Sequence, residues 1–168
     1  MFNKILVAID RSTTSRNVFE TVVPLAKMTG ASLMLLHVSS NEEKDNLSPS
    51  INPKREDSRL DSSTLEAYYR HWQELERQQQ QELEVMRSLV KEATAAGVNT
   101  EFTQTIGDPG KTICNFAQTW SADLIVVGSR GLTGIKEIIL GSVSNYVTHH
   151  APCSVFIVHK TSNFNFRF

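Results

Sequence analysis

The chain has 168 residues, of which 40% are hydrophobic and 21% are charged, and its formal net charge at pH 7 is −1. These values predict one soluble domain with its own core, and they exclude a general electrostatic attraction to nucleic acid or to anionic lipid. No apolar run approaches the roughly 18 residues that cross a membrane, and no secretory leader is visible, so we expect a cytoplasmic protein with no nucleic-acid or membrane partner.

Strand and helix signals alternate along the chain, a pattern typical of a parallel sheet flanked by helices. We expect strands at 3–9, 32–38, 99–105, 124–127 and 154–159. We expect helices at 13–29, where Pro24 should introduce a kink, at 64–96, after Asp108 as N-cap, and at 143–150. Right-handed connections then give an α/β fold, a single doubly wound domain whose five-stranded parallel sheet has helices on both faces.

Two segments differ in composition from the rest of the chain. Residues 39–63 contain Pro49, Pro53 and many Ser and Asn residues, with almost no large apolar side chains. This composition predicts a mobile insertion in a domain that spans residues 1–160. The C-terminal tail, 161–168, alternates Phe with polar residues, which suits either a short strand on a partner subunit or a disordered end.

The expected helix at 64–96 contains neither Pro nor Gly, and at this length it would extend roughly 50 Å. A domain of this size cannot cover such a helix, so we expect the four glutamines at 78–81 to be exposed and the N-terminal half to project or to fold back. The apolar stripe of Tyr68, Trp72 and Leu75 predicts an ordinary core face against the sheet. The alternative is a surface that covers a partner subunit or forms a lid over a ligand site.

Three glycines follow the expected fourth strand with a regular spacing. Two residues separate Gly128 from Gly131, and nine further residues precede Gly141 and Ser142. Glycines let backbone N–H groups approach a ligand closely, and the N-terminus of a following helix attracts anions. The pattern therefore indicates a phosphate site. The alternative is structural, because strand-to-helix turns in parallel α/β proteins need glycine and Ser142 would then serve only as an N-cap.

The complete spacing Gly-x2-Gly-x9-Gly-Ser resembles the nucleotide-binding signature of the universal stress protein family, in its ATP-binding branch. Segment 2–10, which ends in the acidic Asp10, looks like the family's first strand, and 33–38 looks like its second. The resemblance implies the strand order 3-2-1-4-5, which places the first and fourth strands side by side. Ligands in open parallel sheets bind at such a point, outside the carboxyl ends of the strands.

The resemblance also implies which residues hold the nucleotide. Asp10 and Val38 would meet its adenine end, Val38 through the backbone, although Asp10 is also a suitable N-cap for the next helix. The phosphate and ribose contacts would come from Gly128, Arg130, Gly131, Gly141, Ser142, Val143 and Ser144. Ala8 and Ser129 complete the expected set. The chain departs from the family at Arg11, where glycine is frequent, and this arginine would either restrict the turn or supply a cation to the phosphates.

These implications lead to one functional expectation, an ATP-binding universal stress protein that acts as a sensor or switch in the stress response. Mg²⁺ would be held mainly by the phosphates, and occupancy would order the loop between Gly128 and Gly141. The last strand, as a sheet edge, would pair with a second copy in a homodimer, and a further protein partner of unknown identity is expected.

No residue is a persuasive candidate for orienting an attacking water, so we expect no catalytic residue and at most slow ATP hydrolysis. A slow ATPase, a binder of AMP or a cyclic nucleotide, and a nucleotide-free interaction module stay open as alternatives.

Other chemistry-bearing residues give weaker signals. Residues 107–112 include Gly-Lys-Thr, but the first glycine of a Walker A motif is replaced by Thr105. No two of the five histidines stand three or four residues apart, so no metal site is expected. Cys114 and Cys153 lack partners at metal-ligand spacing and are expected to be free thiols.

Overall fold

The computed structural model describes residues 1–10, 12–40, 62–129 and 140–159. Five parallel strands form one sheet in the order β3-β2-β1-β4-β5, which confirms the expected doubly wound α/β fold. In chain order, the elements are β1 (Lys4–Ala8), α1 (Thr13–Thr29), β2 (Ser32–Ser39), α3 (Ser62–Ala95), β3 (Thr100–Ile106), α4 (Pro109–Trp120), β4 (Leu124–Gly128), α5 (Ser142–His150) and β5 (Ser154–Val158).

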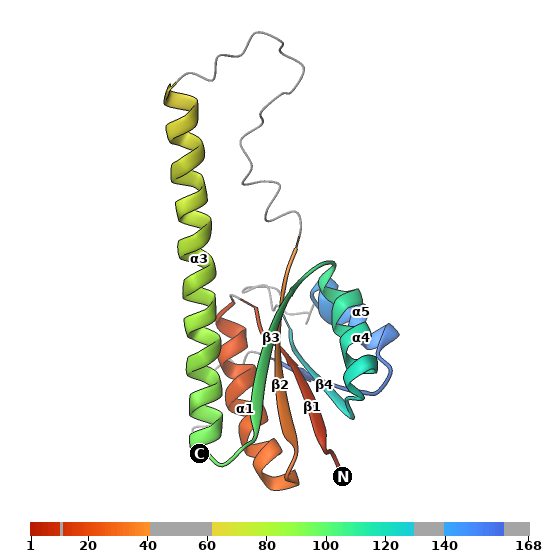
Figure 1. Cartoon of the computed structure of the whole chain (residues 1–168). Coiled ribbons are helices and arrows are strands. Elements are labelled where there is room, and N and C mark those ends of the chain that lie inside the picture. The colour runs from red at the N-terminus through yellow and green to blue at the C-terminus, as the bar shows by residue number, and fades with distance from the viewer. Residues whose placement is uncertain (11, 41–61, 130–139, 160–168) are drawn as a thin grey trace, which may run out of the picture.

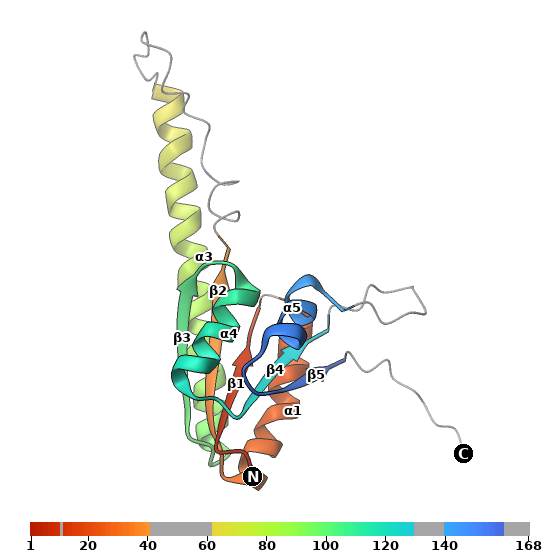
Figure 2. The same cartoon turned by 90° about the vertical axis from the view of Figure 1, so that its right-hand side faces the viewer.

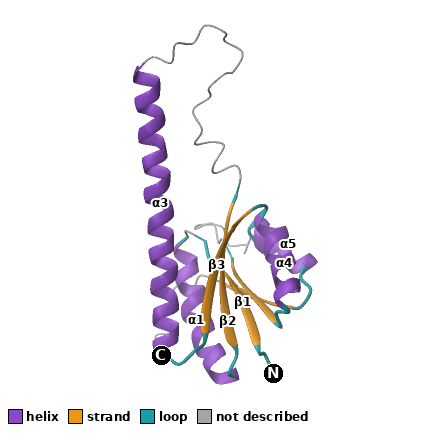
Figure 3. Ribbon diagram, in the orientation of Figure 1, coloured by secondary structure: helices purple, strands orange, loops and turns teal. Residues whose placement is uncertain are grey.

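The helices cover the sheet in two layers. Figure 1 shows α1 and α3 on one face and α4 and α5 on the other, and Figure 3 separates the same layers by secondary structure. Side chains of a strand alternate between the two faces. Along β1, Ile5 and Val7 therefore join the core under α1 and α3, whereas Leu6 joins the core under α4 and α5.

Local sequence signals set the helix ends. The first helix continues through Pro24 and stops at Gly30, whose φ of 71° is in the left-handed region that favours glycine. Its N–H donates to the Ala26 carbonyl. The expected N-cap of α4 is confirmed, because the Asp108 carboxylate accepts from the Lys111 backbone N–H at 2.9 Å.

Helix α3 is much longer than the strands of the sheet (Figure 1). Its C-terminal half packs on the sheet through Met86, Leu89 and Ala93, which are buried. Its N-terminal half projects beyond the carboxyl ends of the strands (Figures 1 and 2). Of the two arrangements expected from the sequence, projecting or folding back, the helix therefore adopts the first. There Tyr69 is 66% exposed and Trp72 50% exposed.

The prediction of an ordinary core face at Tyr68, Trp72 and Leu75 is therefore wrong for Trp72. Tyr68 and Leu75 are half-buried, and Tyr68 contacts Trp72 edge-on with ring centroids 5.9 Å apart. The apolar periodicity of the sequence is the same in both halves of α3, but only the C-terminal half has a sheet to pack against.

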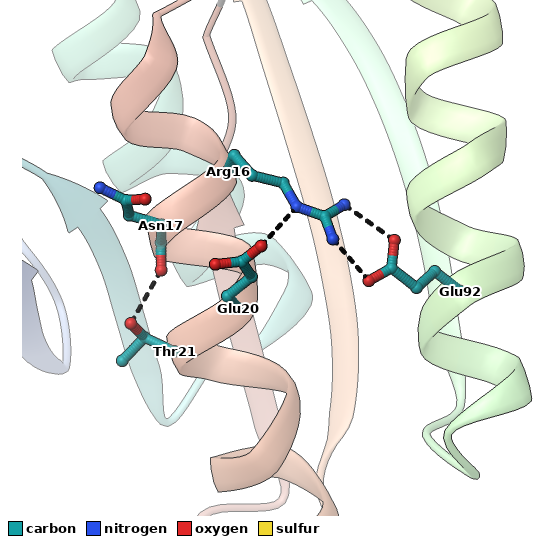
Figure 4. Close-up of polar contacts among 5 residues, drawn as sticks. All are labelled: Arg16, Asn17, Glu20, Thr21 and Glu92. Atoms are coloured by element: carbon teal, nitrogen blue, oxygen red, sulfur yellow. Dashed lines mark hydrogen bonds and ion pairs between the residues drawn. The ribbon is translucent and has the colours of Figure 1, made fainter.

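An ion pair links the C-terminal half of α3 to α1 (Figure 4). The Arg16 guanidinium donates to both carboxylate oxygens of Glu92 at 2.8 Å and to Glu20 at 2.7 Å. The hydrogen bond from Arg16 lowers the pKa of Glu92. These side chains are about half exposed, so the contact orients the two helices more than it stabilises the fold.

Candidate functional site

A hollow of about 470 Å³ lies at the carboxyl ends of the strands, where β1 and β4 are neighbours. The helix that follows β1, α1, covers one face of the sheet, and the helix that follows β4, α5, covers the other, so a crevice is expected between the carboxyl ends of these two strands. The hollow therefore lies where the strand order alone predicts a ligand site.

Apolar and polar groups both line this hollow. The apolar side chains come mainly from the strand ends and α4, and they include Ala8, Leu36, Val38, Ile113, Val127 and Val143. The polar side chains come from the segment after β1 and from the start of α5, and they include Asp10, Ser12, Thr14, Ser15, Ser142 and Ser144. Such a lining suits a ligand with a flat apolar part and a charged part.

The carboxylate of Asp10 organises the segment that joins β1 to α1. Its Oδ1 accepts from the backbone N–H of Ser12 at 2.9 Å and from the hydroxyls of Ser12 and Ser15. The Ser15 hydroxyl in turn accepts from the backbone N–H of Asp10 at 2.8 Å. The N-cap of α1 is Ser12 and not Asp10, so Asp10 fixes this turn from two residues before the cap.

The start of α5 is attached to the end of β4. The Ser144 hydroxyl donates to the Gly128 carbonyl at 2.7 Å, and Gly141 is the N-cap, with its carbonyl accepting from Asn145 N–H at 2.9 Å. The N–H groups in the first turn of a helix point away from it along the axis and carry partial positive charge. Ser142, Val143 and Ser144 all line the hollow, so this end of it favours an anion.

Glycine at position 128 is required by packing. A Cβ there would lie 2.8 Å from Cγ2 of Thr14 and 3.2 Å from Cγ2 of Val18, both on α1. The absence of a side chain lets α1 approach the carboxyl end of β4. Part of the glycine motif therefore serves the fold, as the structural alternative held, while Gly128 also lines the hollow.

Most of the residues expected to hold a nucleotide come together here. Lining the hollow are Ala8, Asp10, Val38, Gly128, Gly141, Ser142, Val143 and Ser144. Ser129 is buried elsewhere: its hydroxyl is 2.8 Å from His159 Nδ1 and its N–H donates to the Val158 carbonyl. Arg130 and Gly131 lie outside the described residues, as do Arg11, the segment 41–61 and the tail 160–168.

Several lining residues were not assigned from the sequence. Ser12, Thr14 and Ser15 belong to a run of hydroxyl residues that begins two positions after Asp10, a signal that is visible in the sequence. Pro109 and Ile113 belong to α4 and are about a hundred residues from Asp10 along the chain. The connection from β3 to β4 brings them to the carboxyl end of the sheet.

Within residues 1–10, 12–40, 62–129 and 140–159 there is no group of three or more His, Cys, Asp or Glu side chains that would hold a metal ion. No helix in the same part of the chain is long and apolar enough to span a bilayer. Cys114 and Cys153 are free thiols, and burial raises the pKa of both.

Comparison with known proteins agrees with this geometry. The model of the universal stress protein family matches residues 1–159. The chain belongs to the universal stress protein family. Among curated universal stress proteins, it is 35% identical over 158 residues to Sll1388 of Synechocystis sp., with 94% of this chain and 97% of the relative covered. It is 36% identical over 162 residues to YxiE of Bacillus subtilis, with 94% and 99% covered.

Solved structures of universal stress proteins share the fold. One from Arabidopsis thaliana, with AMP bound, superposes with a TM-score of 0.66 at 22% identity and covers 95% of this chain and 93% of its own. A universal stress protein in complex with cAMP superposes with a TM-score of 0.60 at 22% identity and covers 95% of this chain and 98% of its own.

Proposed function

We propose that this universal stress protein binds an adenine nucleotide, with ATP as the preferred ligand, in the hollow at the ends of β1 and β4. It acts as a sensor or switch in the stress response, in the cytoplasm. One observation carries the proposal: a single crevice joins an apolar lining, the Asp10 turn and the first turn of α5. The two related proteins with AMP and cAMP bound support an adenine nucleotide as the ligand class.

The polarity of the hollow suggests how a nucleotide would lie. The base would contact Ala8, Val38 and Ile113, with Asp10 as acceptor for its polar edge. The phosphates would lie at the start of α5, where the N–H groups of Ser142, Val143 and Ser144 point outward from the helix. Mg²⁺ would be bound mainly by the phosphates, since hard cations in such sites keep several waters and use few protein ligands.

A negative charge introduced at Gly141, the N-cap of α5, tests whether the phosphates of the ligand lie there. Gly141 has φ −62° and ψ 159°, an extended conformation that Asp and Asn both adopt as N-caps. Gly141→Asp would place a carboxylate beside the phosphates, whereas Gly141→Asn has nearly the same shape without the charge. We expect Gly141→Asp to bind ATP at least about tenfold more weakly than Gly141→Asn, which corresponds to about 1.4 kcal/mol.

The experiment is calorimetric titration with ATP, AMP and cAMP, each with and without Mg²⁺, after mass spectrometry of nucleotides released from the freshly purified protein. We expect ATP to bind most tightly and the charge effect to be larger for ATP than for AMP. Equal binding by the Asp and Asn variants would place the phosphates elsewhere. Tighter binding of AMP or cAMP would refute the ATP preference, and no binding by the native chain would refute nucleotide recognition altogether.

We also propose that the protein forms a homodimer through β5. This strand is at the edge of the sheet, and its Phe156 is 41% exposed. An apolar edge strand is stabilised by pairing with an equivalent strand across a twofold axis. Sedimentation of Phe156→Lys should show a monomer with an unchanged circular dichroism spectrum, whereas Met28→Lys, at a 79% exposed site on α1, should leave the dimer intact. A native chain that sediments as a monomer would refute this proposal.

A further inference from the structure

A buried histidine lies between the hollow and the long helix. His37 is on β2, and the alternation along that strand places its side chain, like those of Leu33 and Leu35, on the face covered by α1 and α3. Its Nδ1 is 2.9 Å from the carbonyl oxygen of Ile9. A carbonyl only accepts, so Nδ1 carries a hydrogen and donates it.

The other ring nitrogen faces α3. His37 Nε2 lies 3.5 Å from Oε2 of Glu82 and 3.4 Å from the Ser39 hydroxyl. The side chains of His37 and Glu82 are both largely shielded from water, which strengthens a polar contact between them. Glu82 belongs to the part of α3 between the buried Met86 and the exposed aromatic residues, so this contact is made where the helix leaves the sheet.

Ile9 is the last residue before the Asp10 turn, and β2 holds both of its backbone polar groups. Its N–H donates to the Leu36 carbonyl at 2.9 Å, and its carbonyl accepts from His37. The regular pairing of β1 with β2 ends one residue earlier, at Ala8 and Leu36. The imidazole therefore fixes the peptide between Ile9 and Asp10 just beyond the end of the strand pairing.

We propose that His37 and Glu82 are positioning residues, which hold the Ile9–Asp10 peptide in the orientation that nucleotide binding needs and tie α3 to the ligand site. The inference rests on the proposed function, because Asp10 matters to affinity only if a nucleotide occupies the hollow. His37 is among the residues that line the hollow and Glu82 is not, but the positioning role requires neither side chain to touch the ligand. Their effect passes through the Ile9 carbonyl to the turn in which Asp10 contacts Ser12 and Ser15.

Four variants test this arrangement. In His37→Asn, the side-chain amide nitrogen stands as many bonds from the backbone as histidine Nδ1 and can donate to Ile9, whereas His37→Leu removes the donor. Glu82→Gln removes the charge that faces the ring. Glu92→Gln is the matched control, because it also removes a carboxylate contact of α3 but lies at the Arg16 pair and not at His37.

We expect His37→Leu to bind ATP about tenfold more weakly, the size expected from losing one buried hydrogen bond. His37→Asn should recover affinity to within about threefold of the native chain, Glu82→Gln should weaken binding by about threefold, and Glu92→Gln should bind as the native chain does. Binding by His37→Leu that equals the native affinity would overturn the proposal, as would an equal loss in the Glu92→Gln control.

A second readout is independent of nucleotide. The amides of Asp10 and Ser12 donate to Ser15 and Asp10 respectively, so loss of positioning should speed their hydrogen exchange in His37→Leu and not in Glu92→Gln. If the native chain binds no nucleotide, the proposed function fails while faster exchange still supports the positioning role. Unchanged exchange in His37→Leu would overturn that role whether or not nucleotide binds.

Discussion

Replacing Gly128 with alanine sets two physical effects of opposite sign against each other. Gly128 is not one of the described glycines with positive φ, so its backbone accepts a Cβ without strain. At such a site alanine stabilises a protein by about 0.4–1 kcal/mol, because it restricts the unfolded chain. At Gly128, however, the new Cβ would lie 2.8 Å from Thr14 Cγ2 and 3.2 Å from Val18 Cγ2.

The collision should decide the outcome. Val18 is 1% exposed and Thr14 is buried, so neither side chain moves aside freely. Overpacking of this kind costs about 1–3 kcal/mol, so the middle of the two ranges gives a net destabilisation of about 1 kcal/mol, which lowers Tm by about 2–4 °C for a chain of this length. Thr14→Ser deletes the methyl group that is 2.8 Å away, so it should restore part of the lost stability in the double variant.

Urea unfolding monitored by circular dichroism, applied to Gly128→Ala, Thr14→Ser and the double variant, measures this coupling. We expect the double variant to be more stable than the sum of the two single changes predicts, by about 0.5–1 kcal/mol. A Gly128→Ala variant as stable as the native chain, or strictly additive effects, would refute the packing explanation for this glycine.

Three further outcomes follow from other contacts. Gly110→Ala should destabilise the chain by about 1–3 kcal/mol in urea unfolding, because its Cβ would lie 2.7 Å from the Tyr146 ring, and Tyr146→Ala should relieve the clash. Asp108→Ala should cost about 1 kcal/mol in thermal unfolding through loss of the α4 N-cap, while Asp108→Asn should cost less; equal losses would contradict capping. The hydrogen bond from Arg77 lowers the pKa of Glu74 from 4.5 to about 2, so its contribution to stability should be complete above pH 4.5 and be lost as the pH falls through about 2. Carboxyl titration by NMR should show this pKa rising toward 4.5 in high salt or in Arg77→Ala, and an unshifted value in the native chain would contradict it.

The fold was predictable because its signals are local and repeated. Apolar runs near 5–7, 33–36 and 124–127 are long enough for buried strands, and Gly30 and Asp108 mark helix ends by their own chemistry. The exposure of Trp72 was not predictable in this way. Periodicity shows that residues share a helix face, but whether a sheet lies under that face depends on where the strands end.

The sequence predicted the glycine motif of the candidate site better than it predicted the direction of individual side chains. Gly141 and Ser142 follow from the spacing of the motif, Ser144 follows from the family resemblance, and all three line the hollow. The motif also contains Ser129, which does not line the hollow and contacts His159 instead. Sequence spacing reports neighbours along the chain and says little about which way each side chain points. The contact between His37 and Glu82 joins residues 45 positions apart, and no local pattern marks it.

The geometry of α3 has a mechanical consequence. Glu92 fixes the helix against α1, Glu82 contacts His37 about 15 Å further toward the N-terminus, and residue 62 lies about 45 Å from Glu92 at 1.5 Å per residue. Met86 is the first buried side chain along the described part of α3, so in a rigid rod that pivots there, about 6 Å from Glu82 and about 36 Å from residue 62, a shift of about 1 Å at Glu82 becomes about 6 Å at the far end. A small tilt of α3 where Glu82 contacts His37 would therefore displace the exposed Tyr69 and Trp72 by a larger distance.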